Sequence, residues 1–364
     1  MNDGSERGGA SFRLVACRLE PNAVVTRAQG YAPAVPRTSL CDLLGIEHPI
    51  LSVGFGPTAG PELVAAVSAA GGCGVLGGSS VPPAVLRDRI RAVRARTDRP
   101  FGVNLLLHQP QDLQMDVCVE ERVPLVVTFW GDAAPFVERA RGSWTKVFHQ
   151  VGSLADAREA AAAGVDAVIA QGSEAGGHVK GRIALAALLP EIVDALRPLP
   201  VLASGGIGDG RGIAAALLLG AVGVSLGTRF VASEEAHTVR EYKERIVRAG
   251  TGDTVYSEFL FDGMWPDAPH RALRNGVVRE WESAGSPPSG KRPGEGTTIA
   301  RAKRANGTEI EVKRYSSFML TPEITVDIEE APLWAGQSVA VIREIKPAGD
   351  IVRDLVREAD AALA

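Results

Sequence analysis

The residue types best suited to chemistry lie around His178, in the segment AVIAQGSEAGGHVKG at 167–181. A short apolar run at 168–170 predicts a buried strand, and the glycine-rich segment after it carries this single imidazole. Histidine exchanges protons near neutral pH, and Gly176 and Gly177 let a backbone approach a planar ligand because they have no Cβ atom. A lone histidine is more often structural, but these glycines and the strand end favour His178 as a catalytic residue.

Two further glycine-rich segments predict an anion site. They read ASGGIGDG at 203–210 and GTR at 227–229, and each follows a predicted strand directly. Clustered glycines expose successive backbone N–H groups, and a helix beginning at Gly210 or Arg211 would add its positive end. The alternative is that the glycines only form tight turns. It is less favoured because three glycines come together in the first segment.

Amide side chains stand at the ends of two other predicted strands. Asn104 and Gln171 would face the same opening as the segment 52–60, which follows the first strand. An amide pairs a donor with an acceptor and suits the heteroatom-lined edge of a flavin or a nucleobase. A capping role at the strand end is the alternative for Asn104. His108 and His149 also fall near strand ends, without motif support.

Short apolar runs alternating with helical stretches would position these residues. The segments 69–78, 162–172 and 218–228 repeat one order: helix end, glycine, short apolar strand, glycine. This repetition predicts a parallel sheet covered by helices. The α/β fold class we predict is a (β/α)₈ TIM barrel and not an open doubly wound sheet, because the anion signals come late in the chain. The predicted strands are 50–53, 74–76, 101–106, 125–129, 146–150, 167–170, 201–204 and 222–226.

We divide the chain into four parts. Residues 1–37 are rich in Gly, Arg, Ser, Pro and Ala and predict a flexible N-terminal extension. Residues 38–256 form the barrel, 257–340 a smaller, mainly helical cap or lid that serves as a substrate subdomain, and 341–364 a helix returning to the barrel. The Pro/Gly/Ser-rich stretch 283–296 is expected to be mobile.

Composition excludes several classes of partner. A net charge of −4 and a pI near 6.0 give no reason to expect nucleic acid or an anionic membrane as a partner. No apolar run approaches the ~20 residues of a membrane span, and the first residues lack the order of a signal peptide. The four cysteines are widely spread, without metal-ligand spacing. We therefore expect a cytoplasmic protein with reduced thiols and no metal.

Several short motifs together carry a family resemblance: EAGGH at 174–178, SGGIGDG at 204–210, LGTRF at 226–230, RALRN at 271–275 and WAGQS at 334–338. In this combination the chain resembles the nitronate monooxygenase (2-nitropropane dioxygenase-like) family from Leu40 to its C-terminus. The resemblance implies a TIM barrel that binds FMN. The segment SVGFG at 52–56 departs from the Ala-Pro-Met-(Ala/Gly) that is usual there, beside the flavin.

The resemblance also implies roles for individual residues. Backbone groups of the glycine-rich segments would bind the FMN phosphate, and residues at the strand ends would lie near the isoalloxazine ring. His178 would be the catalytic residue facing the flavin. The phosphate set is Gly205, Gly206, Gly227 and Thr228; the ring set is Val53, Gly54, Asn104, Gln171 and Gly177; Gly176 and Ser204 complete the cofactor-binding residues.

The expected activity is FMN-dependent oxidation of alkyl nitronates by O₂ to a carbonyl compound and nitrite. A nitroalkane would serve after His178 removes its α-proton. One alternative is an NAD(P)H-dependent enoyl-thioester reductase, since the FMN-dependent enoyl-acyl-carrier-protein reductases carry much the same motifs. A second is a flavin-binding module without catalysis. The expected partners are a small-molecule substrate and O₂, with a homodimer left open.

Overall fold

The computed structural model describes residues 35–79, 81–303 and 308–364. These described residues all belong to one compact unit, residues 33–364. The flexible extension expected at 1–37 therefore falls, up to residue 34, outside the described residues.

Eight parallel strands form the main sheet, in the order β1-β9-β8-β6-β5-β4-β3-β2. A parallel bridge between Leu51 and Cys73 joins β1 to the start of β2, so the sheet closes into a barrel. The predicted (β/α)₈ barrel is confirmed, and every predicted strand end lies within one residue of the observed one. The strands are β1 Ile50–Ser52, β2 Gly74–Gly77, β3 Phe101–Leu106, β4 Leu125–Phe129, β5 Lys146–Val151, β6 Ala167–Gln171, β8 Val201–Ser204 and β9 Gly223–Leu226.

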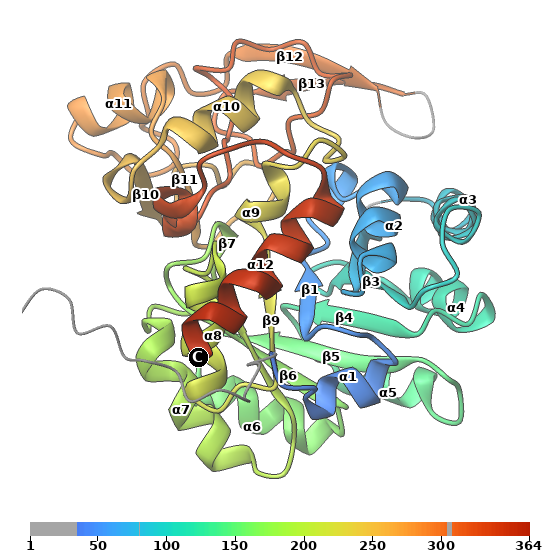
Figure 1. Cartoon of the computed structure of the whole chain (residues 1–364). Helices are drawn as coiled ribbons and strands as arrows, with labels where there is room; N and C mark the ends of the chain where they lie inside the picture. The colour runs from blue at the N-terminus through green and yellow to red at the C-terminus, as the bar shows by residue number, and fades with distance from the viewer. Residues whose placement is uncertain (1–34, 80, 304–307) are drawn as a thin grey trace, which may run out of the picture. The chain divides into compact units, whose positions relative to one another are not determined.

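Two apolar layers explain why these strands are apolar on both faces. Leu51, Phe148 and Ile169 belong to a cluster inside the barrel, and a larger cluster fills the space between strands and helices. The helices lie outside the strands, and α12 runs beside α8 (Figure 1). They are α1 Ser39–Leu44, α2 Pro61–Ala69, α3 Pro83–Arg94, α4 Asp112–Glu120, α5 Ala134–Ala140, α6 Leu154–Ala163, α7 Leu185–Leu196, α8 Gly210–Leu218, α9 Thr228–Val231, α10 Arg240–Arg248 and α12 Ala348–Leu363. None of the described helices is long and apolar enough to cross a membrane.

The segment after the barrel differs from the mainly helical cap that was expected. Between residues 254 and 341 the described chain contains more strand than α-helix. β-Branched and aromatic residues such as Thr254, Val255 and Tyr256 favour strands there. The elements are β10 Thr254–Ser257, β11 His270–Leu273, α11 Gly276–Ser283, β12 Thr298–Lys303, β13 Glu309–Lys313 and the 3₁₀ helix η3 Gln337–Val341. The proposed boundaries at 256/257 and 340/341 fall inside β10 and η3, so we propose 254–341 as the cap.

The cap contributes to the barrel opening through a small second sheet. β11 pairs antiparallel with β10 and also with β7, which is Gly177–His178. The glycine-rich segment that follows β6 is therefore held by strand pairing, where the sequence indicates only a loop.

The stretch 283–296 is also held, at Arg292, contrary to the mobility expected of it. The Arg292 side chain is 3% exposed and forms an ion pair with Asp262 at 2.6 Å. It donates further hydrogen bonds to the carbonyls of Phe259 (2.6 Å) and Leu260 (3.0 Å). A buried, paired guanidinium is costly to release, so this stretch is anchored to the segment before β11.

Candidate active site around His178

His178 lies just beyond the C-terminal end of β6, the end where βα barrels carry their active sites. Its carbonyl accepts a hydrogen bond from Nε2 of Gln171 (3.0 Å), whose Oε1 accepts one from the Lys180 N–H (3.2 Å). Gln171 is buried at the end of β6. Its amide therefore helps to position His178, and one N–H and one lone pair of the amide have no partner among the described residues.

Aromatic rings from both the barrel and the cap surround the His178 imidazole. The indole of Trp265 stacks on it, with centroids 3.9 Å apart and planes at 29°. Trp334 lies at 5.3 Å, the His270 imidazole at 6.0 Å and Trp130 at 6.2 Å. These rings cover much of the candidate catalytic group, which keeps partial exposure.

This environment decides the charge of the imidazole. Burial lowers the pKa of His178 to about 3, and the neighbouring imidazoles of His270 and His108 lower it further. The ring is therefore neutral at neutral pH. Its Nε2 lies 3.3 Å from Oγ of Ser317, with the donor set by the tautomer. A neutral ring can hold an anionic group by donating a hydrogen bond, but it is a weak base.

His270 is fixed as a neutral partner of this cluster. Its Nδ1 lies 3.0 Å from the Ala268 carbonyl, so that nitrogen carries the proton. Its Nε2 accepts a hydrogen bond from the Phe261 N–H (3.0 Å). With both nitrogens engaged, His270 supports the site and is not available to substrate.

The strand-end residues proposed from the sequence meet at the barrel opening. A Cβ on Gly54 would lie 2.5 Å from Cβ of Asn104, so only glycine permits this approach of β1 to β3. The Asn104 amide donates to the Val127 carbonyl (3.1 Å). At the same end of β1, the Cβ position of Gly227 lies 3.8 Å from Val53. The loops after β1 and β9 are thus neighbours.

Glycines of the segment after β6 and of the cap make further close contacts at this opening. A Cβ on Gly176 would lie 2.3 Å from the backbone nitrogen of Gly336. That N–H donates to Oγ1 of Thr228 (3.0 Å). Gly177, in contrast, has nothing within 4 Å of its Cβ position and a φ of +69°. The structure therefore brings Gly176 and Thr228 together through Gly336, and it leaves an opening beside Gly177.

The loop after β8 offers hydrogen-bond donors for an anion. Ser204 ends β8 and is buried, and Gly205 and Gly206 follow with φ of +101° and +72°. Within the described residues, no acceptor takes a hydrogen bond from the N–H groups of Gly205, Gly206 or Gly227. Unpaired N–H groups on neighbouring loops are what a phosphate requires.

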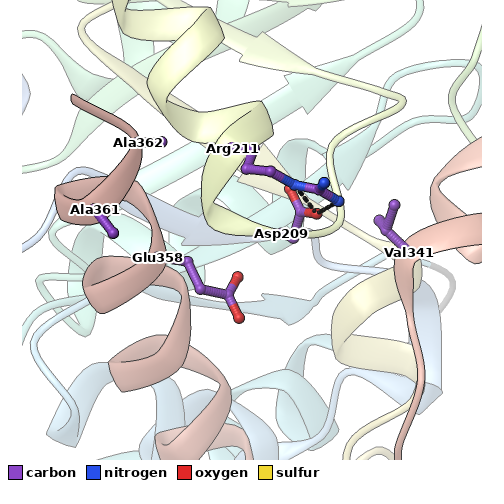
Figure 2. Close-up of a pocket in the computed structure, with 6 residues that line it drawn as sticks. All are labelled: Asp209, Arg211, Val341, Glu358, Ala361 and Ala362. Carbon is purple, nitrogen blue, oxygen red and sulfur yellow. Dashed lines mark hydrogen bonds and ion pairs between the residues drawn. The ribbon is translucent and has the colours of Figure 1, made fainter. Parts of the chain in front are cut away.

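The expected contribution of α8 to this anion site is wrong. Asp209 caps α8 by accepting from the Gly212 N–H (3.2 Å), and Glu358 accepts from the Gly210 N–H (2.9 Å). Both carboxylates line a surface pocket between α8 and α12, where Arg211 is paired with Asp209 (Figure 2). The positive end of α8 is already compensated by protein carboxylates, which repel a further anion.

Gln150 is a candidate that the motifs do not mark. Side chains alternate along β5, and Phe148 belongs to the interior cluster, so Gln150 also faces the interior, at the opening. It is buried, and its amide has no hydrogen-bond partner among the described residues. The strand-end position that selects Asn104 and Gln171 selects Gln150 as well.

His149 and His108, the two histidines that no motif marks, lie in different environments. His149 is buried on the helix-facing side of β5, with Nδ1 2.8 Å from Oγ1 of Thr128, and burial lowers its pKa to about 4. His108 stacks on Trp265 at 3.6 Å, and its buried Nδ1 has no partner in the described part of the chain. His108 therefore belongs to the site, whereas His149 is structural.

Known proteins resemble this chain in both sequence and fold. The model of the family described as nitronate monooxygenase matches residues 37–120 and 110–358. A 5-hydroxy-7a-methyl-1-oxo-octahydro-1H-indene-4-carboxyl-CoA dehydrogenase of Rhodococcus jostii is 36% identical over 69% of this chain and 69% of its own length. A probable nitronate monooxygenase of Staphylococcus saprophyticus is 30% identical over 67% of this chain and 80% of its own.

Solved structures of two similar proteins have the same fold as this chain. FabK from Thermotoga maritima has a TM-score of 0.73 and 36% identity, covering 90% of this chain and 97% of its own. Nitroalkane oxidase from Streptomyces ansochromogenes has a TM-score of 0.71 and 26% identity, covering 89% of this chain and 99% of its own. The family match spans most of the described barrel and cap, and the chain therefore belongs to the nitronate monooxygenase family of flavin-dependent oxidoreductases.

Proposed function

We propose that this chain binds FMN and oxidises alkyl nitronates with O₂, giving a carbonyl compound and nitrite. The observation that carries the proposal is the neutral His178 imidazole, enclosed by aromatic rings next to the glycine-lined opening at Gly177. A nitronate is a planar anion. A neutral N–H donor in a water-poor site stabilises such a group without exchanging a proton with it.

The residues at the opening fit the cofactor. The unpaired N–H groups of Gly205, Gly206 and Gly227 would hold the phosphate, together with Thr228. The flat ring would lie along Gly177, where no atom occupies the Cβ position, with the Gln150 amide free to pair with its polar edge. When bound, FMN supplies the one-electron and oxygen chemistry.

The protein itself would bind and orient the substrate and keep water away from it. Gln171 sets the position of His178 through the backbone, and the rings of Trp265 and Trp334 cover it. Because the pKa of His178 is lowered to about 3, taking the α-proton of a neutral nitroalkane is unfavourable. We therefore propose preformed nitronates, and not nitroalkanes, as the substrates.

Oxygen uptake and nitrite release test this function, with ethyl nitronate and nitroethane compared at equal concentration. We expect turnover of the nitronate and much slower turnover of the nitroalkane. His178→Ala should lose about 10²-fold or more in kcat/KM while keeping its flavin absorbance, because it removes a hydrogen-bond donor to the anionic group. His237→Ala, at an exposed histidine paired with Glu323, is the matched control and should behave as the unaltered protein. A flavin-loaded protein with no nitronate turnover would contradict the proposal.

A second candidate is NAD(P)H-dependent chemistry on a thioester. It is favoured by the CoA-linked name of the Rhodococcus jostii relative, which is 36% identical, against 30% for the Staphylococcus saprophyticus nitronate monooxygenase. Anaerobic mixing separates the two functions. Rapid bleaching of the flavin by NAD(P)H, followed by its reoxidation with an enoyl thioester, would support the second candidate. An unchanged flavin spectrum would exclude it.

A further inference from the structure

The segment 258–269 forms a closed loop over His178. It joins β10 to β11, and because Ser257 pairs with His270 its two ends lie together. Trp265 sits in this loop, between Met264 and Asp267, which have φ of +80° and +56°. Left-handed backbone is strained at non-glycine residues, and such positions persist where the surrounding structure determines them.

The first half of the loop is fixed to the rest of the cap. Gly263 donates to the Tyr315 carbonyl (3.1 Å), and its own carbonyl accepts from the Ser317 N–H (2.7 Å). The buried Arg292 binds the Phe259 and Leu260 carbonyls. The loop therefore holds Trp265 at a defined place, and the same backbone also carries Ser317 to Nε2 of His178.

The Trp265 indole lies between two imidazoles. Its centroid is 3.9 Å from that of His178 and 3.6 Å from that of His108, with planes at 29° and 12°. Two rings stacked on one indole at these distances must lie on its opposite faces. Trp130 meets its edge at 5.2 Å. One face of His178 is thus covered, and Gly177, the residue before it, has open space at its Cβ position.

We propose that Trp265 is the specificity-determining residue of this site, and that it limits substrates to short, unbranched nitronates. The inference rests on the proposed function. The indole covers one face of His178, so a planar nitronate that binds against this imidazole lies beside Trp265, and a long or branched substituent would meet the indole. His108 stacks on the opposite face of the indole, which limits how far Trp265 can move away from a substrate.

The test compares ethyl nitronate with the nitronate of 2-nitrooctane. Trp265→Ala should raise the ratio of kcat/KM for the long over the short substrate by about tenfold or more, since each methylene admitted to an apolar pocket counts strongly. Trp265→Phe, which keeps a stacking ring, should change it less. Trp144→Ala is the matched control, because Trp144 is 80% exposed in the turn between α5 and β5, at the other end of the barrel.

A binding measurement separates this inference from the proposed function. Propionate and octanoate are planar anions that need no turnover, and their stabilisation of the flavin-loaded protein against heat reports affinity. Trp265→Ala should bind octanoate more tightly than the unaltered protein does, with propionate unchanged. If nitronates are not turned over but Trp265→Ala binds octanoate more tightly, the proposed function is wrong and the role of Trp265 in limiting ligand size is supported. Unchanged selectivity in both measurements, with normal flavin content, would overturn the inference.

Discussion

At the scale of the residue, the charge of His178 decides which chemistry the site can perform. The glycines around it and the strand end predict its importance, but its surroundings come from residues far away in the sequence. Trp265, Ser317 and Trp334 all belong to the cap, and no local pattern links them to His178. The lowered pKa is therefore a property of the fold and could not be predicted from the motif.

This lowered pKa has a kinetic consequence. With a pKa of about 3, His178 stays neutral down to about pH 4, so its protonation does not limit the reaction above that pH. We expect kcat/KM for a preformed nitronate to show no inflection from His178 between about pH 6 and pH 8. Stopped-flow mixing of the nitronate into each buffer provides the measurement, and His237→Ala provides the comparison. An inflection near the ordinary histidine value would show that the ring titrates freely.

At the scale of the element, the barrel could be predicted almost completely, while the cap could not. Buried parallel strands are apolar on both faces, so β4 and β6 are visible as continuous apolar runs. β7 is only Gly177–His178 and exists because β11 pairs with it. The hairpin of β12 and β13 is largely exposed and charged, so it lacks the apolar periodicity that would reveal strands.

The two glycines beside His178 have different physical reasons to be glycine. Gly176→Ala would place a methyl group 2.3 Å from backbone atoms of Gly336, which cannot move aside. We expect a loss of about 1–3 kcal/mol or more in the free energy of unfolding, measured with urea. Gly177→Ala meets no atom, so only the left-handed φ is penalised, but its methyl group would stand in the opening.

Gly142 is the matched control for that pair. It has a φ of +75°, open space around its Cβ position and a place in the turn before β5. Gly142→Ala and Gly177→Ala should therefore lose similar amounts of stability, about 1 kcal/mol. Only Gly177→Ala should also lose flavin content or nitronate turnover. Equal activity in the two variants would mean that the opening beside Gly177 is not where ligands bind.

At the scale of the whole molecule, the barrel and the cap share one site. The barrel supplies His178, the unpaired N–H groups and the strand-end amides, and the cap supplies the rings and the hydroxyl around the imidazole. Arg271 reinforces the link, since its guanidinium donates to the Ser173 carbonyl (3.0 Å) just before the glycines. The RALRN motif thus joins the two parts through Arg271.

The buried histidines of both parts predict how the folded molecule responds to acid. Burial lowers the pKa of His149 and His178, and also that of His270. The unfolded chain binds protons at these residues below about pH 6.5, while the folded chain binds them only at lower pH. The free energy of unfolding must therefore fall as the pH drops below that value, by up to about 1.4 kcal/mol per pH unit for each residue.

His149→Asn tests this response, because asparagine can still donate to Thr128 and cannot titrate. We expect the variant to be less stable at about pH 7, owing to the smaller side chain, yet to lose less stability between about pH 6.5 and pH 5. Urea unfolding at several pH values gives both slopes. Identical slopes for His149→Asn and the unaltered chain would mean that His149 takes up its proton in the folded barrel as readily as in the unfolded chain.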